Sequence, residues 1–166
     1  YGQVVQLGSP LGPSQQLVWI WTPHSKSVKQ FYGKGYVLTG NSAEFLDPVF
    51  SSGVAFATES ALKAAKLIFK EVHNKPVDWE KEYSDYIKYG VNVFRTYVKE
   101  WYTGNLQTLF FHKPSNPIIK RQICSVLAGY VWDKTNPFVT KHDKLVKNLA
   151  YIINSEKESS KVNFSN

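Results

Sequence analysis

The feature that most constrains the fold of this chain is a strand-to-helix transition in residues 40–60, GNSAEFLDPVFSSGVAFATES. A short apolar run, residues 36–38, leads into a loop of small, turn-forming residues. A helical pattern then begins at Gly53 and continues to about Val72. The start of a helix offers backbone N–H groups without intrahelical partners, together with the positive end of the helix dipole. The stretch therefore predicts a site for an anionic or phosphate-bearing ligand, without naming that ligand.

Helical patterns outnumber strand patterns in the rest of the chain. Apolar residues recur at helical spacing in four long segments and one short one, residues 53–72, 78–102, 118–131, 141–156 and 106–111. Short apolar runs indicate strands at residues 3–7, 17–21 and 36–39. These strands are too few to cover four helices with a sheet of their own. We therefore expect an α+β fold, mainly helical, whose few short strands form the edge of a larger sheet.

The same patterns predict which side chains are buried. The inward face of the first helix is expected to carry small apolar residues, namely Val54, Ala57, Ala61, Ala64 or Ala65, and Ile68. Cys124 is the single cysteine and lies in an apolar stretch of the third long helix, which predicts a buried structural thiol. Residues 132–140 are expected to form a loop, and the polar tail after residue 156 is expected to fray.

The net charge of +7 admits an anionic partner, but its distribution favours an ordinary solvated surface over nucleic-acid binding. Only Arg95 and Arg121 supply the guanidinium groups that read bases well, and the lysines are spread along the chain. No apolar run approaches the length of a membrane span, and a single cysteine fits a reducing compartment. The expectations are a cytoplasmic protein, no nucleic-acid partner and no membrane span.

Motifs for metal binding and nucleophilic catalysis are missing from the sequence. The four histidines, His24, His73, His112 and His142, are scattered, so no metal site is expected. The pattern G-x-S-x-G is absent, and so are G-x-G-x-x-G and the P-loop pattern. The chain contains no methionine, so its first residue is not a native start, and we expect a fragment of a longer protein.

The loop in residues 35–53, GYVLTGNSAEFLDPVFSSG, resembles the second FAD-binding motif of flavin-dependent monooxygenases and halogenases, which reads roughly G-D-A-A-G-F-x-D-P-x-x-S-x-G. The helix that follows, FATESALKAAK, is also similar to its counterpart in halogenase-like oxidoreductases. In residues 19–23, WIWTP resembles the W-x-W-x-I-P signature of flavin-dependent halogenases, with one residue missing. The resemblance is specific over residues 35–70 and only general from residue 78 onward.

The resemblance implies a role for individual residues. Asn41 stands where the family has an aspartate that hydrogen-bonds the ribityl or ribose hydroxyls of FAD. Ser52 and Gly53 would offer backbone N–H groups beside the flavin ring, where halogenases hold halide, and the helix dipole would stabilise reduced, anionic flavin. Trp19 and Trp21 would lie on the substrate side by this resemblance, whereas their strand spacing alone, which puts both indoles on one side, favours a place in the core. The cofactor-binding residues implied by the motif are Gly40, Asn41, Ser42, Ala43, Asp47, Pro48, Ser51, Ser52 and Gly53.

By the same resemblance, residues 1–72 form part of an FAD-binding region and residues 73–166 a C-terminal helical region. The glycine-rich βαβ unit of the family and its halogenase lysine are not in this sequence, so the isolated fragment is expected to be inactive. The intact protein would be an FAD-dependent monooxygenase, halogenase or reductase acting on a small aromatic or carrier-bound substrate. The alternative is a cofactor-free helical module that docks an acidic partner, such as a carrier protein or nucleic acid.

Overall fold

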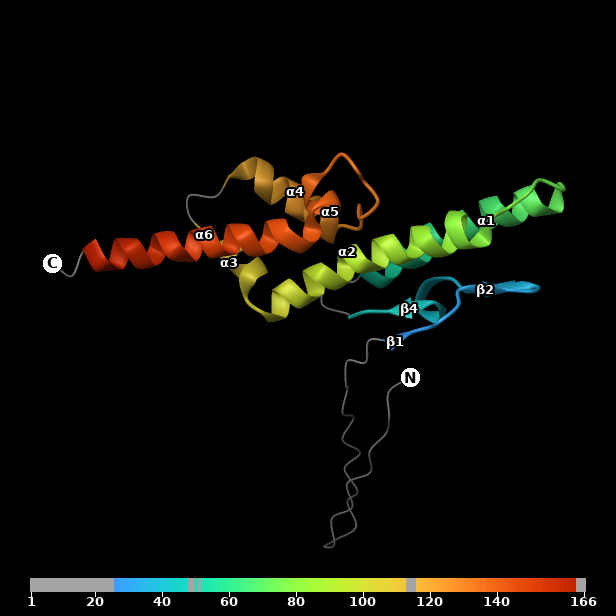
Figure 1. The fold of residues 1–166 in the computed structure, drawn as a ribbon, viewed down its shortest axis with the longest axis horizontal. Coiled ribbons are helices and arrows are strands. Elements are labelled where there is room, and N and C mark those ends of the chain that lie inside the picture. Colours follow the sequence, from blue (N-terminus) through green and yellow to red (C-terminus); the bar gives the residue numbers. More distant parts are fainter. Residues whose placement is uncertain (1–25, 48–49, 51, 113–115, 164–166) are drawn as a thin grey trace, which may run out of the picture.

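The computed structural model describes residues 26–47, 50, 52–112 and 116–163, and this part of the chain is mainly helical (Figure 1). Its helices are α1 (Ser52–Val72), α2 (Asp85–Tyr102), α3 (Asn105–Phe111), α4 (Pro117–Leu127), α5 (Pro137–Thr140) and α6 (His142–Asn163). A five-residue π-helical turn, η3 (Glu80–Ser84), leads directly into α2. The expectation of a mainly helical α+β fold is confirmed.

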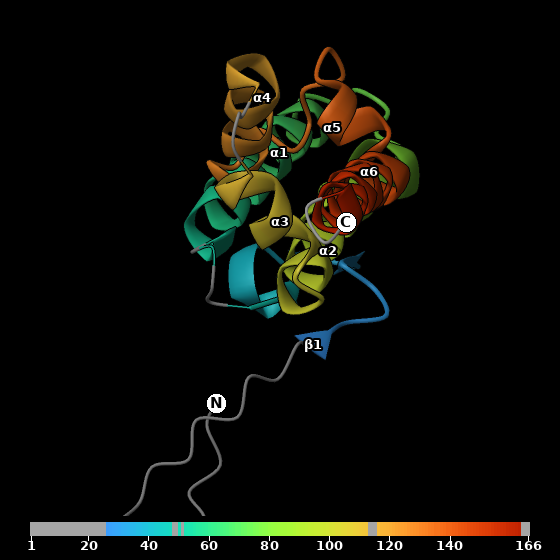
Figure 2. The ribbon, with the colours of Figure 1, turned by 90° about the vertical axis from the view of Figure 1, so that its left-hand side faces the viewer.

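Four two-residue strands form two antiparallel pairs along one side of α1 and α2 (Figures 1 and 2). They are β1 (Lys26–Ser27), β2 (Tyr32–Gly33), β3 (Tyr36–Val37) and β4 (Glu44–Phe45), and the 3-10 turn η1 (Gly40–Ser42) lies between β3 and β4. Strand β1 pairs with β4, and β2 pairs with β3 through a tight turn at Gly35, whose φ is +81°. Glycine adopts the left-handed conformation that such a turn requires without steric cost.

The described side chains form two core clusters. One lies among α2, α3, α4, α5 and α6 and includes Tyr97, Leu106 and Val146. The other lies between α1, η3 and the strand segments. Leu46 and Trp132 pack against both clusters, so they join the strand and loop segment to the C-terminal helices.

Trp132 is seated on α2 at a glycine. Its indole stacks on the ring of Tyr86 at a centroid distance of 5.3 Å, and its Nε1 donates to the backbone carbonyl of Tyr86 at 2.9 Å. A Cβ added at Gly90 would come within 2.2 Å of the indole. The absence of a side chain at Gly90 is therefore what lets the loop between α4 and α5 lie flat against α2.

The predicted inward face of α1 is confirmed at Ala64 but is wrong at Val54, Ala61 and Ile68. The buried line on this helix is Ser52, Phe56, Ser60, Ala64 and Leu67, whereas Val54 is 75% exposed and Ile68 is also exposed. The larger side chains of Phe56 and Leu67 fill the second core cluster, and Ser60 is drawn inward by a backbone hydrogen bond described below. Small apolar residues are compatible with either face, so their spacing alone was misleading.

Three further expectations are corrected by the structure. Cys124 is exposed rather than buried, because Ile123 and Val126 take the inward face of α4. Pro137–Thr140 forms the short helix α5 inside the expected loop, and Asn136 caps it by accepting from the N–H of Phe138. The tail after residue 156 continues α6 to Asn163. Trp19 and Trp21 lie outside the described residues, as do the strands expected at 3–7 and 17–21.

The start of the second long helix is confirmed at Asp78. Its carboxylate accepts from the N–H of Lys81 at 3.1 Å, and the Glu82 carboxylate accepts from the N–H of Asp78 at 3.2 Å. This reciprocal arrangement satisfies donors that the first turn would otherwise leave unpaired.

Among the helices that the structure describes, none is both long and apolar enough to cross a membrane.

Replacing Gly90 with alanine is expected to destabilise the fold by about 1–3 kcal/mol, because the new methyl group displaces the Trp132 indole. Urea denaturation followed by tryptophan fluorescence measures the change. Lys99→Ala, at an exposed position of the same helix, is the control and is expected to be nearly neutral. Equal stability of Gly90→Ala and the wild-type chain would contradict the seating of Trp132 on α2.

Candidate functional site

A hollow of about 270 Å³ lies between the η1–β4 segment and the first turn of α1. Four of the cofactor residues expected from the sequence border it, namely Asn41, Asp47, Ser52 and Gly53. Its other described lining residues are Glu44, Phe45, Leu46, Val54 and Phe56. Gly40, Ser42 and Ala43 lie in or beside η1 and do not line the hollow, and Pro48 and Ser51 lie outside the described residues.

Gly40 fixes the loop against α1. Its φ is +55°, its N–H donates to Ser60 Oγ at 2.9 Å, and the Ser60 hydroxyl donates in turn to the carbonyl of Ala57 at 3.1 Å. A Cβ added at Gly40 would lie 3.0 Å from the Ala57 methyl group. The backbone of the loop therefore approaches the helix as closely as a glycine opposite an alanine allows.

A second hydrogen bond holds the chain two residues before Gly40. The hydroxyl of Tyr83, a fully buried side chain, donates to the carbonyl of Leu38 at 2.6 Å. Burial raises the pKa of Tyr83 to about 12, because a phenolate would lose its hydration. Tyr83 is thus a neutral hydrogen-bond donor throughout the physiological pH range. The sequence placed Tyr83 only in the apolar stripe of the helical segment 78–102. No local pattern predicted the hydrogen bond of its hydroxyl with Leu38.

The side chain of Asn41 lies beside the first turn of α1. A Cβ added at Gly53 would be 3.4 Å from Asn41 Oδ1, so a larger residue at position 53 would crowd the amide. Asn41 is exposed, whereas Ser52 is buried. Ser42 points elsewhere, since its hydroxyl donates to the carbonyl of Thr39 at 2.6 Å. Ala43 is buried in the second core cluster, so its contribution to the site is packing.

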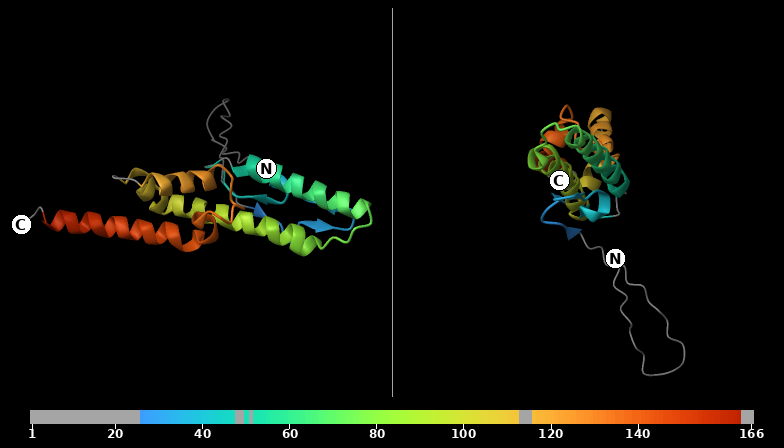
Figure 3. Two further views of the ribbon diagram at one scale, coloured as in Figure 1. Left: turned by 90° about the horizontal axis from the view of Figure 1, so that it is seen from above. Right: turned by 90° about the vertical axis from the view of Figure 1, so that its right-hand side faces the viewer.

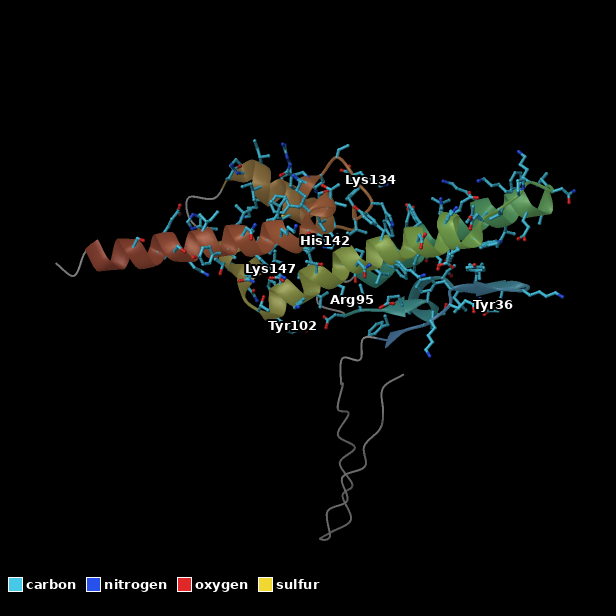
Figure 4. All side chains as sticks on the ribbon, in the orientation of Figure 1. Tyr36, Arg95, Tyr102, Lys134, His142 and Lys147 are labelled. Carbon is cyan, nitrogen blue, oxygen red and sulfur yellow. The ribbon has the colours of Figure 1, made fainter. Side chains whose placement is uncertain are left out.

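Two carboxylates flank the hollow, and both have partners on α2. Asp47 is 8% exposed and accepts from the Tyr102 hydroxyl at 3.1 Å, a contact that raises the pKa of Tyr102. Glu44 is 3% exposed and forms an ion pair with Arg95, whose Nη2 lies 3.0 Å from Glu44 Oε1. Figure 4 shows Arg95 and Tyr102 along the edge of α2 on the side of the strands. The ion pair neutralises one of the two acidic groups at the rim.

Glu44 is a site residue that the sequence analysis missed. It occupies the position where the flavin motif has its second glycine, and the motif gives no reason to expect a buried carboxylate there. Its partner Arg95 is 51 residues away in sequence, and no local pattern connects the two. The charge pair became visible only once the fold placed β4 beside α2.

The geometry suits one portion of a polar, anionic ligand. The N-terminal turn of α1 borders the hollow, and a helix of this length presents free N–H groups and a positive dipole end at that point. The hollow is below the 300–1,000 Å³ typical of a complete small-molecule site. The described residues alone therefore enclose less space than a complete small-molecule site needs. A glycine-anchored loop that feeds a helix start in this way is a feature of nucleotide-cofactor proteins.

A family model described as tryptophan halogenase matches residues 21–153, which is more than half of the chain. The chain belongs to the tryptophan halogenase family.

Two curated relatives are halogenases of carrier-bound substrates. The 1H-pyrrole-2-carbonyl-[peptidyl-carrier protein] chlorinase of Pseudomonas fluorescens is 32% identical over 113 residues, 66% of this chain and 24% of the relative. The 1H-pyrrole-2-carbonyl-[peptidyl-carrier protein] brominase of Pseudoalteromonas luteoviolacea is 26% identical over 127 residues, 74% of this chain and 29% of the relative. The matched part of the chain thus spans less than a third of the length of these proteins.

A solved structure extends the comparison to the fold. The flavoprotein/dehydrogenase from Cytophaga hutchinsonii matches with a TM-score of 0.76 and 50% sequence identity, over 79% of this chain and 32% of that protein. Together with the family match, this neighbour confirms the expectation of a halogenase-like flavoprotein. It also indicates a flavin as the cofactor class.

Gly40→Ala is expected to destabilise the chain more than Gly35→Ala. Both glycines have positive φ, so either alanine incurs a backbone cost of about 1–2 kcal/mol. Only the alanine at position 40 also meets the Ala57 methyl group, because the space around Gly35 is open. Urea unfolding of the two variants measures the difference. Equal losses would show that the close approach of the loop to α1 contributes nothing.

Proposed function

We propose that this chain supplies the second FAD-binding segment of an FAD-dependent halogenase. The observation that carries the proposal is the gathering of Asn41, Asp47, Ser52 and Gly53 around one hollow at the start of α1, in a chain of the tryptophan halogenase family. When bound, FAD would supply the redox chemistry that oxidises halide for transfer to a substrate. The proposed division into residues 1–72 for cofactor binding and 73–166 as a helical region rests on the same grounds.

The residues at the hollow have distinct proposed roles. Asn41 would hydrogen-bond the ribityl or ribose hydroxyls, since its amide both accepts and donates. The backbone N–H groups of Ser52 and Gly53 would face the flavin ring and a halide ion. The dipole of α1 would stabilise negative charge on the reduced ring. The Glu44–Arg95 pair would keep the rim close to neutral, so that a phosphate-bearing cofactor meets only the charge of Asp47.

The substrate proposed is a small aromatic acyl group attached to a carrier protein. Support comes from the two curated relatives, whose names state a pyrrole-2-carbonyl group on a peptidyl carrier protein. Trp19 and Trp21 remain candidates for the substrate side. The remainder of the flavin site would come from residues beyond those described here, because the hollow is too small for a complete dinucleotide.

The full-length encoded protein tests this proposal. It is purified, scanned for a flavin spectrum, and supplied with reduced FAD, oxygen, chloride or bromide, and a pyrrole-2-carbonyl group on a peptidyl carrier protein. Mass spectrometry of the carrier is expected to show a gain of one halogen that depends on the halide added. A gain of one oxygen in the presence of halide would identify a monooxygenase instead. The absence of any flavin response would refute the proposal altogether.

Asn41→Asp is expected to tighten FAD binding by the full-length protein about fivefold. A carboxylate accepts hydrogen bonds from sugar hydroxyls about 1 kcal/mol more strongly than an amide does. Quenching of flavin fluorescence gives the Kd. Ser42→Ala is the matched control, since its hydroxyl is bonded to the Thr39 carbonyl away from the hollow, and no change is expected there. Weaker binding by Asn41→Asp than by the wild type would rule out the hydroxyl contact.

The isolated 166-residue chain is expected to bind no FAD at micromolar concentration and to turn over no substrate, because the described residues form one side of the site. Titration of FAD with the purified chain, followed by fluorescence, provides the measurement. The full-length protein serves as the positive control. Micromolar affinity of the isolated chain would contradict the inference that the site is divided.

A further inference from the structure

A second hollow of about 210 Å³ lies among α3, α4 and α6, far along the chain from the candidate flavin site. Figures 2 and 3 show these three helices grouped at the end of the molecule where α6 ends. Most of its lining is apolar, contributed by Leu109, Phe110, Ile119, Ile123, Leu149 and Ile153. Neither the family match nor the relatives assign a function to this hollow.

Large apolar side chains around this hollow remain exposed. Ile152, which lines it, is 50% exposed. Ile118 and Phe111, the chain neighbours of lining residues, are 56% and 77% exposed. Exposed apolar side chains beside an apolar hollow, with polar residues at its border, are a composition typical of a protein–protein contact. We call this surface, formed by the hollow with Phe111, Ile118 and Ile152, the α3/α4/α6 patch.

The border of the patch is basic. Lys120 lines the hollow, Arg121 follows it, and both side chains are exposed. Among the described residues neither is in an ion pair, while Glu156 on the same border already has an interaction of its own. Residues 116–163 contain eight Lys and Arg against four Asp and Glu. The net positive charge is therefore concentrated in the part of the chain that carries the patch.

We propose that the α3/α4/α6 patch docks an acidic carrier protein, which delivers the substrate. The inference rests on the proposed function, because a carrier-bound substrate requires a surface that binds the carrier. An acidic partner would complement Lys120 and Arg121 and cover the exposed side chains of Phe111, Ile118 and Ile152. A second copy of this chain fits less well, since it would bring the same excess of basic over acidic residues in 116–163 to the contact. Nucleic acid would leave the apolar floor without a partner.

Charge reversal on the patch tests the inference. The full-length protein is titrated calorimetrically with the phosphopantetheinylated peptidyl carrier protein of the P. fluorescens chlorinase. Lys120→Glu/Arg121→Glu is expected to weaken binding at least tenfold. The matched control is Lys66→Glu/Lys75→Glu, which changes the net charge equally at exposed positions of α1 and the turn after it, and is expected to change the Kd less than twofold. Equal weakening by both pairs, or by neither, overturns the proposal.

A photo-crosslink identifies the occupant directly. A benzophenone amino acid replaces Ile118, and after irradiation with the carrier present the crosslinked species is identified by mass spectrometry. A crosslink to the carrier supports the proposal, whereas a crosslink to another segment of the same chain or to a second copy overturns it. The flavin spectrum is recorded on the same samples. Flavin without carrier binding refutes only this inference, and carrier binding without flavin refutes only the proposed function.

Discussion

The hydrogen bond from the Gly40 N–H to the Ser60 hydroxyl, with Ala57 packed against the same glycine, sets the geometry on which the candidate site depends. It places the loop after β3 directly on α1, about two turns from the helix start at Ser52. The Tyr83 hydroxyl donates to the carbonyl of Leu38, two residues earlier, and restrains the same entry to the loop. From this fixed entry, η1 and β4 border a hollow that the first turn of α1 closes. The shape of the site therefore depends on contacts of Gly40 and Leu38 that lie outside the hollow itself.

Charge is arranged differently at the two surfaces discussed above. At the candidate flavin site, the buried Glu44 is paired with Arg95 and Asp47 accepts a hydrogen bond from the Tyr102 hydroxyl, so each acidic group has a partner on α2. On the α3/α4/α6 patch, Lys120 and Arg121 stand without acidic partners among the described residues. An internally balanced rim suits a cofactor whose charge is met by backbone groups and a helix dipole. An unbalanced rim suits a partner that brings the opposite charge.

Much of the architecture could be predicted from apolar periodicity. The starts of the long helices were placed within a few residues, because stripes such as Tyr83, Ile87 and Phe94 leave little freedom, whereas the polar end of α6 up to Asn163 was missed. The hollow was anticipated at residues 40–53, because the motif concentrates its signal in one continuous segment. What sequence could not supply was contact between distant residues, such as Glu44 with Arg95. The buried face of α1 was also misjudged, since an Ala-rich sequence does not favour one face strongly. The hydrogen bond between Ser60 and the Gly40 N–H, which turns Ser60 inward, could not be read from the sequence.

Leu46 and Trp132 each pack against both core clusters. Leu46 belongs to the segment that lines the hollow, and Trp132 follows α4. The two core clusters are therefore connected by side chains that pack against both of them. Local unfolding of one cluster would expose apolar surface of the other. In the language of native-state hydrogen exchange, the cofactor loop and the C-terminal helices belong to one cooperative unit. A ligand that orders the loop would slow amide exchange in α4 as well, because Leu46 of the loop packs against the cluster that holds Ile123 and Val126.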